Sequence, residues 1–348
     1  MKSLRKVALV SSYVPFIDGG ARNIVNWLAV KLREEGLEVA IVWIPQIDIP
    51  SKLVKQMLVY RLLRLDDADM VITFRPMSHL VEHPNKVVWF IHHIRPFYDL
   101  WDSEHRGFPR DNKHQSLRDL IMRVDTDALS SARRVFTNSI QVQMRLKKYN
   151  SIESEVLYPP LFDSQKYSTR EFNDEIVCIG RLEPHKRPDL FIKALATTNS
   201  KVKLRFLGVA SNENYANELK KLIEKNHLRD RVILENRWVE ESEKIEALAN
   251  CLATIYAPED EDSYGYPSLE SSYSRKPIIT TTDSGGVVEL VTHGFNGWIC
   301  KPTDQELGKV FDDAFNNKET TRIMGENALT RLDQLEISWD NVLRKLLS

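Results

Sequence analysis

The stretch KVALVSSYVPFIDGGARNIVNWLAVKLREEGLEVAIVWI, residues 6–44, indicates how the chain folds. Residues 6–12 and 37–44 are rich in aliphatic and β-branched side chains, as buried strands are. Between them lies a helical pattern that ends at Gly36. Its apolar residues fall on one side: Ile24, Trp27, Leu28, Val30 and Leu32. A strand, a helix and a second strand in this order predict a β-α-β unit with parallel strands.

The same alternation continues along the chain. Before residue 158, further strands are predicted at 69–74, 86–92 and 134–139. After Tyr158, Pro159 and Pro160 the rhythm restarts, and it predicts strands at 175–180, 202–208, 231–235, 253–258 and 277–281. Two successive prolines interrupt both helix and strand, so they mark a linker. Neither half has a GxGxxG turn after its first strand. The prediction is an α/β protein of two Rossmann-like, doubly wound domains without the dinucleotide fingerprint.

Length and composition limit the classes of function. A chain of 348 residues exceeds what one core usually holds, so two domains are expected. The 48 Lys and Arg against 49 Asp and Glu, with no polybasic tail, argue against nucleic acid as a partner. No apolar run is long enough for a signal peptide or a membrane span, which predicts a cytoplasmic protein. Cys178, Cys251 and Cys300 lack metal-type spacing and are interpreted as reduced core residues.

Residues 51–64, SKLVKQMLVYRLLR, combine cations with apolar side chains. Lys52, Lys55, Arg61 and Arg64 stand among Leu, Val, Met and Tyr. A basic amphipathic helix of this kind can lie on an anionic membrane surface, here the inner face of the cytoplasmic membrane. The alternative is an ordinary helix that covers a sheet.

Two later stretches place polar residues at the carboxyl ends of predicted strands, where open α/β sheets bind ligands. In IGRLEPHKRPDLFIKAL, residues 179–195, Arg181 and Lys186 lie at the turn before a helix, either as a diphosphate site or as surface cations. In DSYGYPSLE, residues 262–270, the amides at the helix start after Gly265 can receive a phosphate or sugar oxygen. Glu270 is one turn further along that helix, where it can accept hydrogen bonds from ribose hydroxyls.

In its motifs and their order, the chain resembles the retaining GT-B glycosyltransferases of family four, the group 1 glycosyltransferases, over nearly its whole length. The matching motifs are Pro15-Phe16-Ile17-Asp18-Gly19-Gly20, His92, Gly180-Arg181-Leu182 with Lys186, Asp262-Ser263-Tyr264-Gly265 with Glu270, and Gly285-Gly286 with Glu289, Gly294 and Gly297. The implied fold is GT-B, with a first domain over 1–158 on the acceptor side and a donor-binding domain over 159–332. The two domains would face one another across a cleft, and a final helix at about 333–348 would cross back to the first domain.

The resemblance also implies a role for each residue. Arg181 and Lys186 would neutralise the departing nucleotide diphosphate, and Glu270 would hold the ribose. Asp262 and the amides of Ser263, Tyr264 and Gly265 would orient the donor sugar. The remaining donor contacts would come from Gly19, Gly20, Gly285, Gly286 and Glu289. His92 would hydrogen-bond the sugar, with His93 as the alternative.

Two features depart from the family pattern or imitate another one. Asp262 stands where the family usually has glutamate, which shortens the carboxylate by one methylene. Asp260-Glu261-Asp262 spells the Asp-x-Asp of metal-dependent glycosyltransferases, but the same pattern recurs at Asp67–Asp69 and Asp125–Asp127. We therefore expect no catalytic metal and no cofactor apart from the nucleotide-sugar substrate.

Residues 91–119 form a long segment rich in aromatic residues, histidines and arginines, with little periodicity before its end. We expect it to line the acceptor side, with Arg95, Tyr98 and Trp101 available for sugar stacking or phosphate contact. The alternative is a solvated loop with a few anchoring aromatics.

The predicted activity is transfer of a hexose, with retention, to a glycan or lipid-linked glycan, in bacterial surface polysaccharide or lipopolysaccharide synthesis. Two rivals stay open: a non-catalytic binding subunit of the same fold, and a sugar-nucleotide epimerase.

Overall fold

The structure, a computed structural model, describes residues 4–16 and 19–348. Ile17 and Asp18, which belong to the glycine motif before the first helix, lie outside the described residues. The chain forms two compact units. The first comprises residues up to Pro159 together with Ser338–Ser348, and the second comprises Pro160–Ile337.

The first unit is built on a six-stranded parallel sheet in the order β2-β1-β3-β4-β5-β6. Its strands are β1 (Lys6–Tyr13), β2 (Glu38–Pro45), β3 (Met70–Thr73), β4 (Lys86–Phe90), β5 (Arg134–Thr137) and β6 (Glu155–Val156). The chain leaves β1 toward β2 and then returns to β3 on the other side of β1. This reversal makes β1 and β3 the topological switch point of the sheet.

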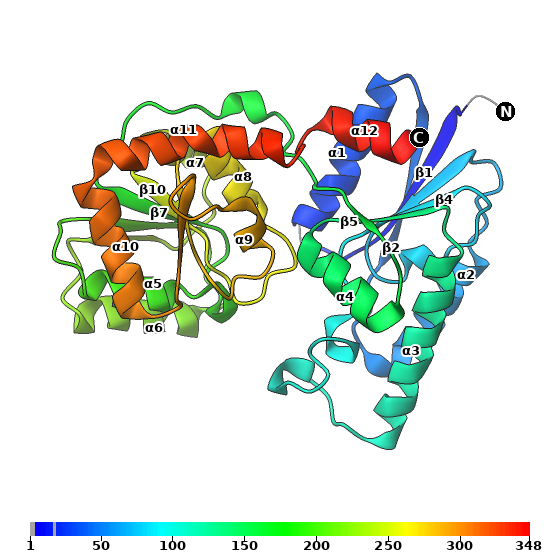
Figure 1. Cartoon of the computed structure of the whole chain (residues 1–348). Helices are drawn as coiled ribbons and strands as arrows, with labels where there is room; N and C mark the ends of the chain where they lie inside the picture. The colour runs from blue at the N-terminus through cyan, green and yellow to red at the C-terminus, as the bar shows by residue number, and fades with distance from the viewer. Residues whose placement is uncertain (1–3, 17–18) are drawn as a thin grey trace. The chain divides into compact units, whose positions relative to one another are not determined.

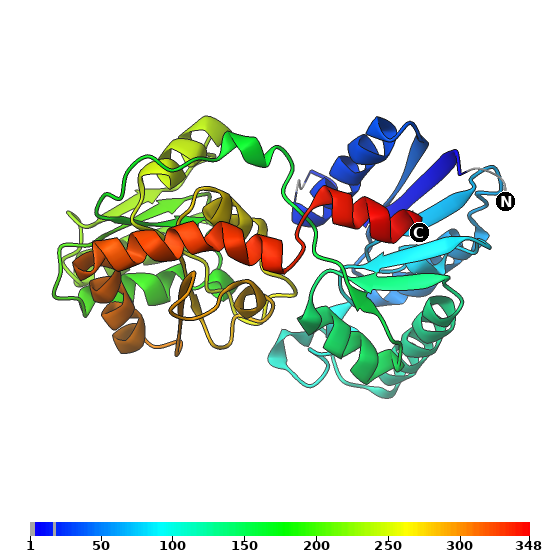
Figure 2. The ribbon, with the colours of Figure 1, turned by 45° about the horizontal axis from the view of Figure 1, so that its top comes forward.

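The α-helices described in the first unit are α1 (Gly20–Glu34), α2 (Leu53–Leu62), α3 (Asn112–Ser130), α4 (Ile140–Asn150) and α12 (Trp339–Leu347). Figures 1 and 2 show α1 beside α12, two helices that are in contact. The predicted apolar face of α1 is partly wrong, because Val30 is exposed and Val25 and Ala29 are buried instead. Val25 and Ala29 lie four residues apart and continue the stripe of Leu28 and Leu32, which is how a helix buries one face.

The second unit repeats the design, with strand order β12-β11-β10-β7-β8-β9, all parallel. Its strands are β7 (Glu175–Ile179), β8 (Lys203–Leu207), β9 (Val232–Glu235), β10 (Ala253–Ile255), β11 (Ile278–Thr281) and β12 (Gly297–Cys300). The chain moves from β7 to β9 in one direction and then returns to β10 on the other side of β7. The switch point of this sheet therefore lies between β7 and β10.

Helices cover both faces of the second sheet (Figure 1). They are α5 (Pro188–Ala196), α6 (Glu213–Lys225), α7 (Glu241–Asn250), α8 (Tyr266–Tyr273), α9 (Val287–Leu290), α10 (Asp304–Asn316) and α11 (Lys318–Gln334). α5 packs against α6 and α10, while α8 packs against α11. The two-domain, doubly wound α/β prediction is confirmed.

The last helix is shorter than predicted. α11 continues to Gln334, and the Ser338 hydroxyl accepts a hydrogen bond from the Asn341 amide to begin α12. α12 then packs in the first unit, where the Arg134 guanidinium donates to the Lys345 carbonyl at 3.0 Å and Lys345 pairs with Glu155.

Candidate active site

The predicted donor residues of the second unit follow three adjacent strands. Arg181 and Lys186 come after β7, residues 262–270 after β10, and Gly285 and Gly286 after β11. Because the three strands are parallel neighbours, their carboxyl ends lie along one edge of the sheet. Local hydrogen bonds join the loops there: the Glu259 amide donates to the His185 carbonyl at 2.8 Å, and the Gly286 amide donates to the Glu261 carbonyl at 2.8 Å.

Lys186 lies at the switch point, held by groups from β10 and its loop. Its Nζ donates to the Tyr256 hydroxyl at 2.7 Å and forms an ion pair with Glu261. Nζ is also 4.9 Å from the centre of the Tyr256 ring, a cation–π distance. Burial acts to raise the pKa of Glu261, but the Lys186 charge and its hydrogen bond outweigh burial and keep that pKa below its ordinary value. Glu261 thus places a carboxylate directly opposite the lysine.

Arg181 is more open than Lys186. Its side chain is 67% exposed, and its Nη1 is 2.6 Å from the Glu183 carboxylate. The turn before it requires glycine, since Gly180 has a φ of +128°. Arg181 therefore lies at the same edge of the sheet, with a solvent-exposed side chain that a ligand can reach.

Glu270 is buried on the first turns of α8, with 7% of the residue exposed. Its Oε1 accepts a hydrogen bond from Lys244 of α7 at 2.7 Å, while Oε2 has no hydrogen-bond partner among the described residues. Burial raises the pKa of Glu270, and Lys244 and the neighbouring Tyr167 phenol oppose that rise. A buried carboxylate oxygen left without a donor is costly, so a ligand hydroxyl at this position would be a favourable partner.

Three glycines let the loops of this edge pack closely. A Cβ on Gly285 would come 2.2 Å from the Glu261 carbonyl oxygen, and one on Gly286 would come 2.6 Å from Ser263 Cα. Gly265 has a φ of +71°, and a Cβ there would come 2.5 Å from the Tyr256 ring. These glycines are thus required by contacts within the protein, and the Gly286 amide is already bonded to the Glu261 carbonyl. Tyr264 is buried, whereas Ser263 and Asp262 are partly exposed. Glu289 lies in the short helix α9 directly after the glycine pair.

The sequence analysis missed an arginine that ties the three loops together. The Arg187 side chain donates to the carbonyls of Ala257 and Pro258, at 3.0 and 2.8 Å, and pairs with Asp283 at 3.0 Å. Its backbone is left-handed, with a φ of 58°, at the N-cap of α5. Burial acts to raise the pKa of Asp283, but the hydrogen bond from Arg187 leads the interactions that lower it.

The other residues that the sequence analysis missed are Lys244, Tyr256 and Glu261. Glu261 stood within the Asp-x-Asp pattern, but it was considered only as a spacer in a metal motif. Lys244 carries no signal in the sequence around it, because it lies on α7 and meets Glu270 only through the return of the chain to the switch point.

Among the residues predicted in the first unit, His92 follows β4 and is partly exposed. Its Nδ1 faces the His93 carbonyl at 2.7 Å, so Nδ1 carries the proton and Nε2 is left as an acceptor. Burial and the charge of Arg75 lower the pKa of His92 to about 3, which makes the ring neutral at pH 7. His93, the alternative, is 3% exposed and bonded to Asn150, so its ring is occupied within the core.

The glycines and the acceptor residues of the first unit differ in accessibility. Gly19 is the N-cap of α1 and Gly20 its first residue. Arg95 is paired with Asp99 at 2.7 Å. Tyr98 and Trp101 are each 1% exposed and belong to the core, where the Tyr98 hydroxyl donates to Asp125 at 2.6 Å. The prediction that these two rings stack on an acceptor sugar does not agree with their burial.

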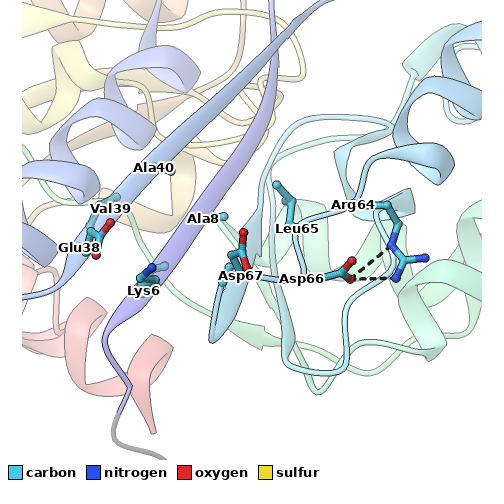
Figure 3. Close-up of a pocket in the computed structure, with 11 residues that line it drawn as sticks. Lys6, Ala8, Glu38, Val39, Ala40, Arg64, Leu65, Asp66 and Asp67 are labelled. Atoms are coloured by element: carbon cyan, nitrogen blue, oxygen red, sulfur yellow. Dashed lines mark hydrogen bonds and ion pairs between the residues drawn. The ribbon is translucent and has the colours of Figure 1, made fainter.

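Three further observations concern the rest of the described structure. A cavity of about 290 Å³ lies at the amino ends of β1 and β2, where Lys6, Glu38 and Asp67 line it (Figure 3). That edge is opposite to the one at which α/β sheets bind their ligands. Within residues 4–16 and 19–348, no group of three or more His, Cys, Asp or Glu side chains is placed to hold a metal ion. Over the same residues, no helix has both the length and the apolar character needed to cross a bilayer.

Comparison with known proteins identifies the class. The two doubly wound units have the GT-B fold of glycosyltransferases: HepE from Anabaena, solved with UDP, superposes with a TM-score of 0.71 over 98% of each chain at 18% identity. Residues 162–331, which make up nearly all of the second unit, match the family model described as Glycosyl transferases group 1, and this unit belongs to that family. The family and the GT-B fold predicted from the motifs are confirmed.

Two curated relatives match part of the chain. Alpha-1,3/1,6-mannosyltransferase ALG2 from Dictyostelium discoideum is 32% identical over 126 residues, which is 36% of this chain and 29% of that protein. N-acetyl-alpha-D-glucosaminyl L-malate synthase from Bacillus anthracis is 25% identical over 185 residues, 52% of this chain and 46% of that protein. The matched segments thus cover less than half of each relative.

Proposed function

We propose that the chain is a metal-independent, retaining glycosyltransferase that moves a hexose from a nucleotide-diphosphate sugar to a hydroxyl of a glycan or glycolipid. The observation that carries this proposal is the arrangement at the switch point of the second sheet. There Lys186 is held by Tyr256 and Glu261, and the neighbouring helix carries the buried Glu270, whose Oε2 has no hydrogen-bond partner among the described residues. A diphosphate and a ribose are the two parts of a nucleotide sugar that these groups suit.

Uridine is the first base to test. The HepE structures contain UDP and, in another crystal, UDP-glucose, and the likeness of fold supports a donor of the same kind. In this reading the second unit binds the donor and the first binds the acceptor. The names of the curated relatives, a mannosyltransferase and an N-acetyl-glucosaminyl L-malate synthase, support the transfer of a sugar unit.

The reaction assigns each group a task. Lys186, joined by Arg181, neutralises the diphosphate as its bond to the sugar breaks, which is the electrostatic term that usually contributes most. Glu270 accepts hydrogen bonds from the ribose through Oε2. Asp262 and the amides of residues 263–265 orient the sugar, and the acceptor hydroxyl attacks from the face that the diphosphate leaves.

In this proposal, Glu261 pairs with Lys186 in the place that the donor phosphate takes during the reaction. It neutralises Lys186 when the site is empty, and the incoming diphosphate displaces it. Because the two anions compete for one cation, removing the Glu261 charge should strengthen nucleotide binding. This expectation separates a donor site from a purely structural ion pair.

The outer face of α2 supports a peripheral membrane contact. Val54, Leu58, Val59 and Leu62 are between 41% and 76% exposed, and the cation Lys55 lies on the same face. The inner face of α2 packs in the core through Leu53, Met57 and Tyr60, so the helix also covers the sheet. An acceptor carried on a lipid of an anionic membrane, as in cell-surface polysaccharide synthesis, would be reached from this side.

The first experiment is a thermal-shift panel with UDP, GDP, dTDP and ADP on the wild type, Lys186→Ala, Glu261→Gln and Lys193→Ala. A nucleotide at about 100 times its Kd adds roughly 2.7 kcal/mol of stability. We expect one nucleotide to stabilise the wild type, Lys186→Ala to lose the response and Glu261→Gln to gain in affinity. Lys193 is the control, since its pair with Asp189 in α5 is exposed.

Turnover completes the test. Loss of one charged contact to the leaving group is expected to lower kcat at least about tenfold in Lys186→Ala. Near-normal turnover in that variant would overturn the assignment. Nucleotide binding without transfer to any acceptor would favour the non-catalytic subunit, and conversion of the donor sugar without acceptor would favour the epimerase.

A further inference from the structure

Arg75 is a cation of the first unit that neither the motifs nor the mechanism uses. It follows β3 by two residues, next to the switch point between β1 and β3. Its guanidinium donates to the Gln46 amide oxygen at 2.7 Å, and Gln46 follows β2 at the same edge of the sheet. This edge is where an open α/β sheet offers its ligand site.

The charge of Arg75 has no counter-ion in direct contact. Among residues 4–16 and 19–348, no carboxylate lies within 4.0 Å of its guanidinium, and its Nε is buried without a hydrogen-bond partner. Burial lowers the pKa of Arg75, and the more distant Asp48 only partly opposes this effect. Asp48 is itself bonded to the Gln46 side chain amide. A partly buried cation whose strongest acceptor is a neutral amide is costly to keep, and binding an anion would remove that cost.

His92 adds a hydrogen-bond acceptor to the surroundings of Arg75. The charge of Arg75 acts on the His92 ring, which is neutral and presents Nε2 as an acceptor. One strand further along, Asn138 is 3% exposed and its Oδ1 has no hydrogen-bond partner among the described residues. The edge therefore carries the Arg75 cation together with acceptors suited to hydroxyl groups.

We propose that Arg75 binds an anionic group of the acceptor, a phosphate or a carboxylate, which replaces the Gln46 amide oxygen as the partner of its guanidinium. The proposal rests on the proposed glycosyl transfer and makes it more specific: the acceptor carries a negative charge near the hydroxyl that is glycosylated. The exchange is favourable because a charge-assisted hydrogen bond is roughly twice as strong as a neutral one. His92 then accepts a hydrogen bond from a neighbouring acceptor hydroxyl.

The test measures anion binding by thermal shift in the Lys186→Ala background, in which the donor-phosphate site is disabled. Inorganic phosphate and succinate are titrated at constant ionic strength. Three further substitutions are compared in that background: Arg75→Gln, Gln46→Glu and, as control, Arg64→Gln, whose side chain is 77% exposed. Gln46→Glu keeps Arg75 and supplies it with a built-in carboxylate.

We expect saturable stabilisation by at least one anion in the control, and loss of that response in both Arg75→Gln and Gln46→Glu. If Arg75→Gln does not fold, Gln46→Glu alone decides. A response to phosphate but not succinate identifies a phosphorylated acceptor, and the reverse identifies a carboxylate. An unchanged response in both variants, or no response in the control, overturns the proposal.

The same variants separate this proposal from the donor assignment. With Lys186 intact, Arg75→Gln should respond to the stabilising nucleotide as the wild type does. An anion response that depends on Arg75 in a protein that binds no nucleotide would leave the anion site standing and remove the proposed function.

Discussion

Lys244→Met is the most informative single test of the Glu270 environment. The substitution removes the ammonium that lies 2.7 Å from Glu270 and leaves a side chain of similar length. Breaking a buried ion pair in this way typically costs about 3–5 kcal/mol. The Lys244 side chain is still 21% exposed, against 9% for Glu270, so solvent reduces the loss, and we expect about 2–3 kcal/mol at pH 7.

The loss should depend on pH with a definite sign. Burial already raises the pKa of Glu270 above its ordinary value, and removing Lys244 raises it further. A carboxyl group whose folded pKa is raised gives the folded state its greatest relative stability below the unfolded pKa, and this advantage disappears as the pH rises through the folded pKa. The deficit of Lys244→Met is therefore largest at neutral pH and shrinks as the pH falls toward about 4.5.

The assay is thermal and urea unfolding of the full chain at pH 7.0 and at mildly acidic pH. For a unit of this size, a loss of 2–3 kcal/mol lowers the Tm by roughly 4–12 °C. Lys193→Met is the matched control, because its ion pair has a similar length, 2.8 Å, but side chains 48% and 38% exposed. Equal effects of the two substitutions at pH 7, or a Lys244→Met deficit that grows in acid, would refute the reasoning.

Two further outcomes are expected. Gly286→Ala should lower the free energy of unfolding by about 1–3 kcal/mol; its φ of −62° suits alanine, so the loss would come from the contact of the new Cβ with Ser263. Gly19→Ala, with nothing within 4 Å of the new Cβ, should lose less than about 1 kcal/mol when both variants are unfolded in urea. Leu58→Ser combined with Leu62→Ser should abolish co-sedimentation with vesicles of anionic phospholipid while leaving the Tm within about 1 °C, because both side chains are exposed; retained binding would show that α2 is only a covering helix.

The strands were predictable because buried parallel strands appear as short β-branched runs, and the predicted bounds agree with β1–β5 and β7–β11 to within a few residues. β6 has only two residues, and β12 follows a glycine turn, so neither produced such a run. Val30 was misassigned because an apolar residue at the margin of a helical stripe can face either way, and contacts with the sheet decide which.

The candidate site, like the fold, was predictable from the sequence only in part. The places of Lys186 after a strand and of Glu270 in the helix that follows another strand were predictable because strand ends and helix starts are visible in the sequence, and their position at one edge follows from the sheet order. Lys244, Glu261 and Arg75 were not found, since their importance depends on which partner each one has or lacks. Tyr98 and Trp101 were misread because an irregular segment rich in aromatics can equally be packed inside.

The position of α12 has a consequence for biosynthesis. The first unit is not continuous in the sequence: all of Pro160–Ile337 is translated before the helix that packs beside α1. On the ribosome, the second unit can therefore complete its fold while the first still lacks Val342, Leu343 and Leu346, which are buried in the finished protein. Nascent chains of the first unit would expose the apolar surface that these residues later cover, and that surface is where a chaperone would be expected to bind.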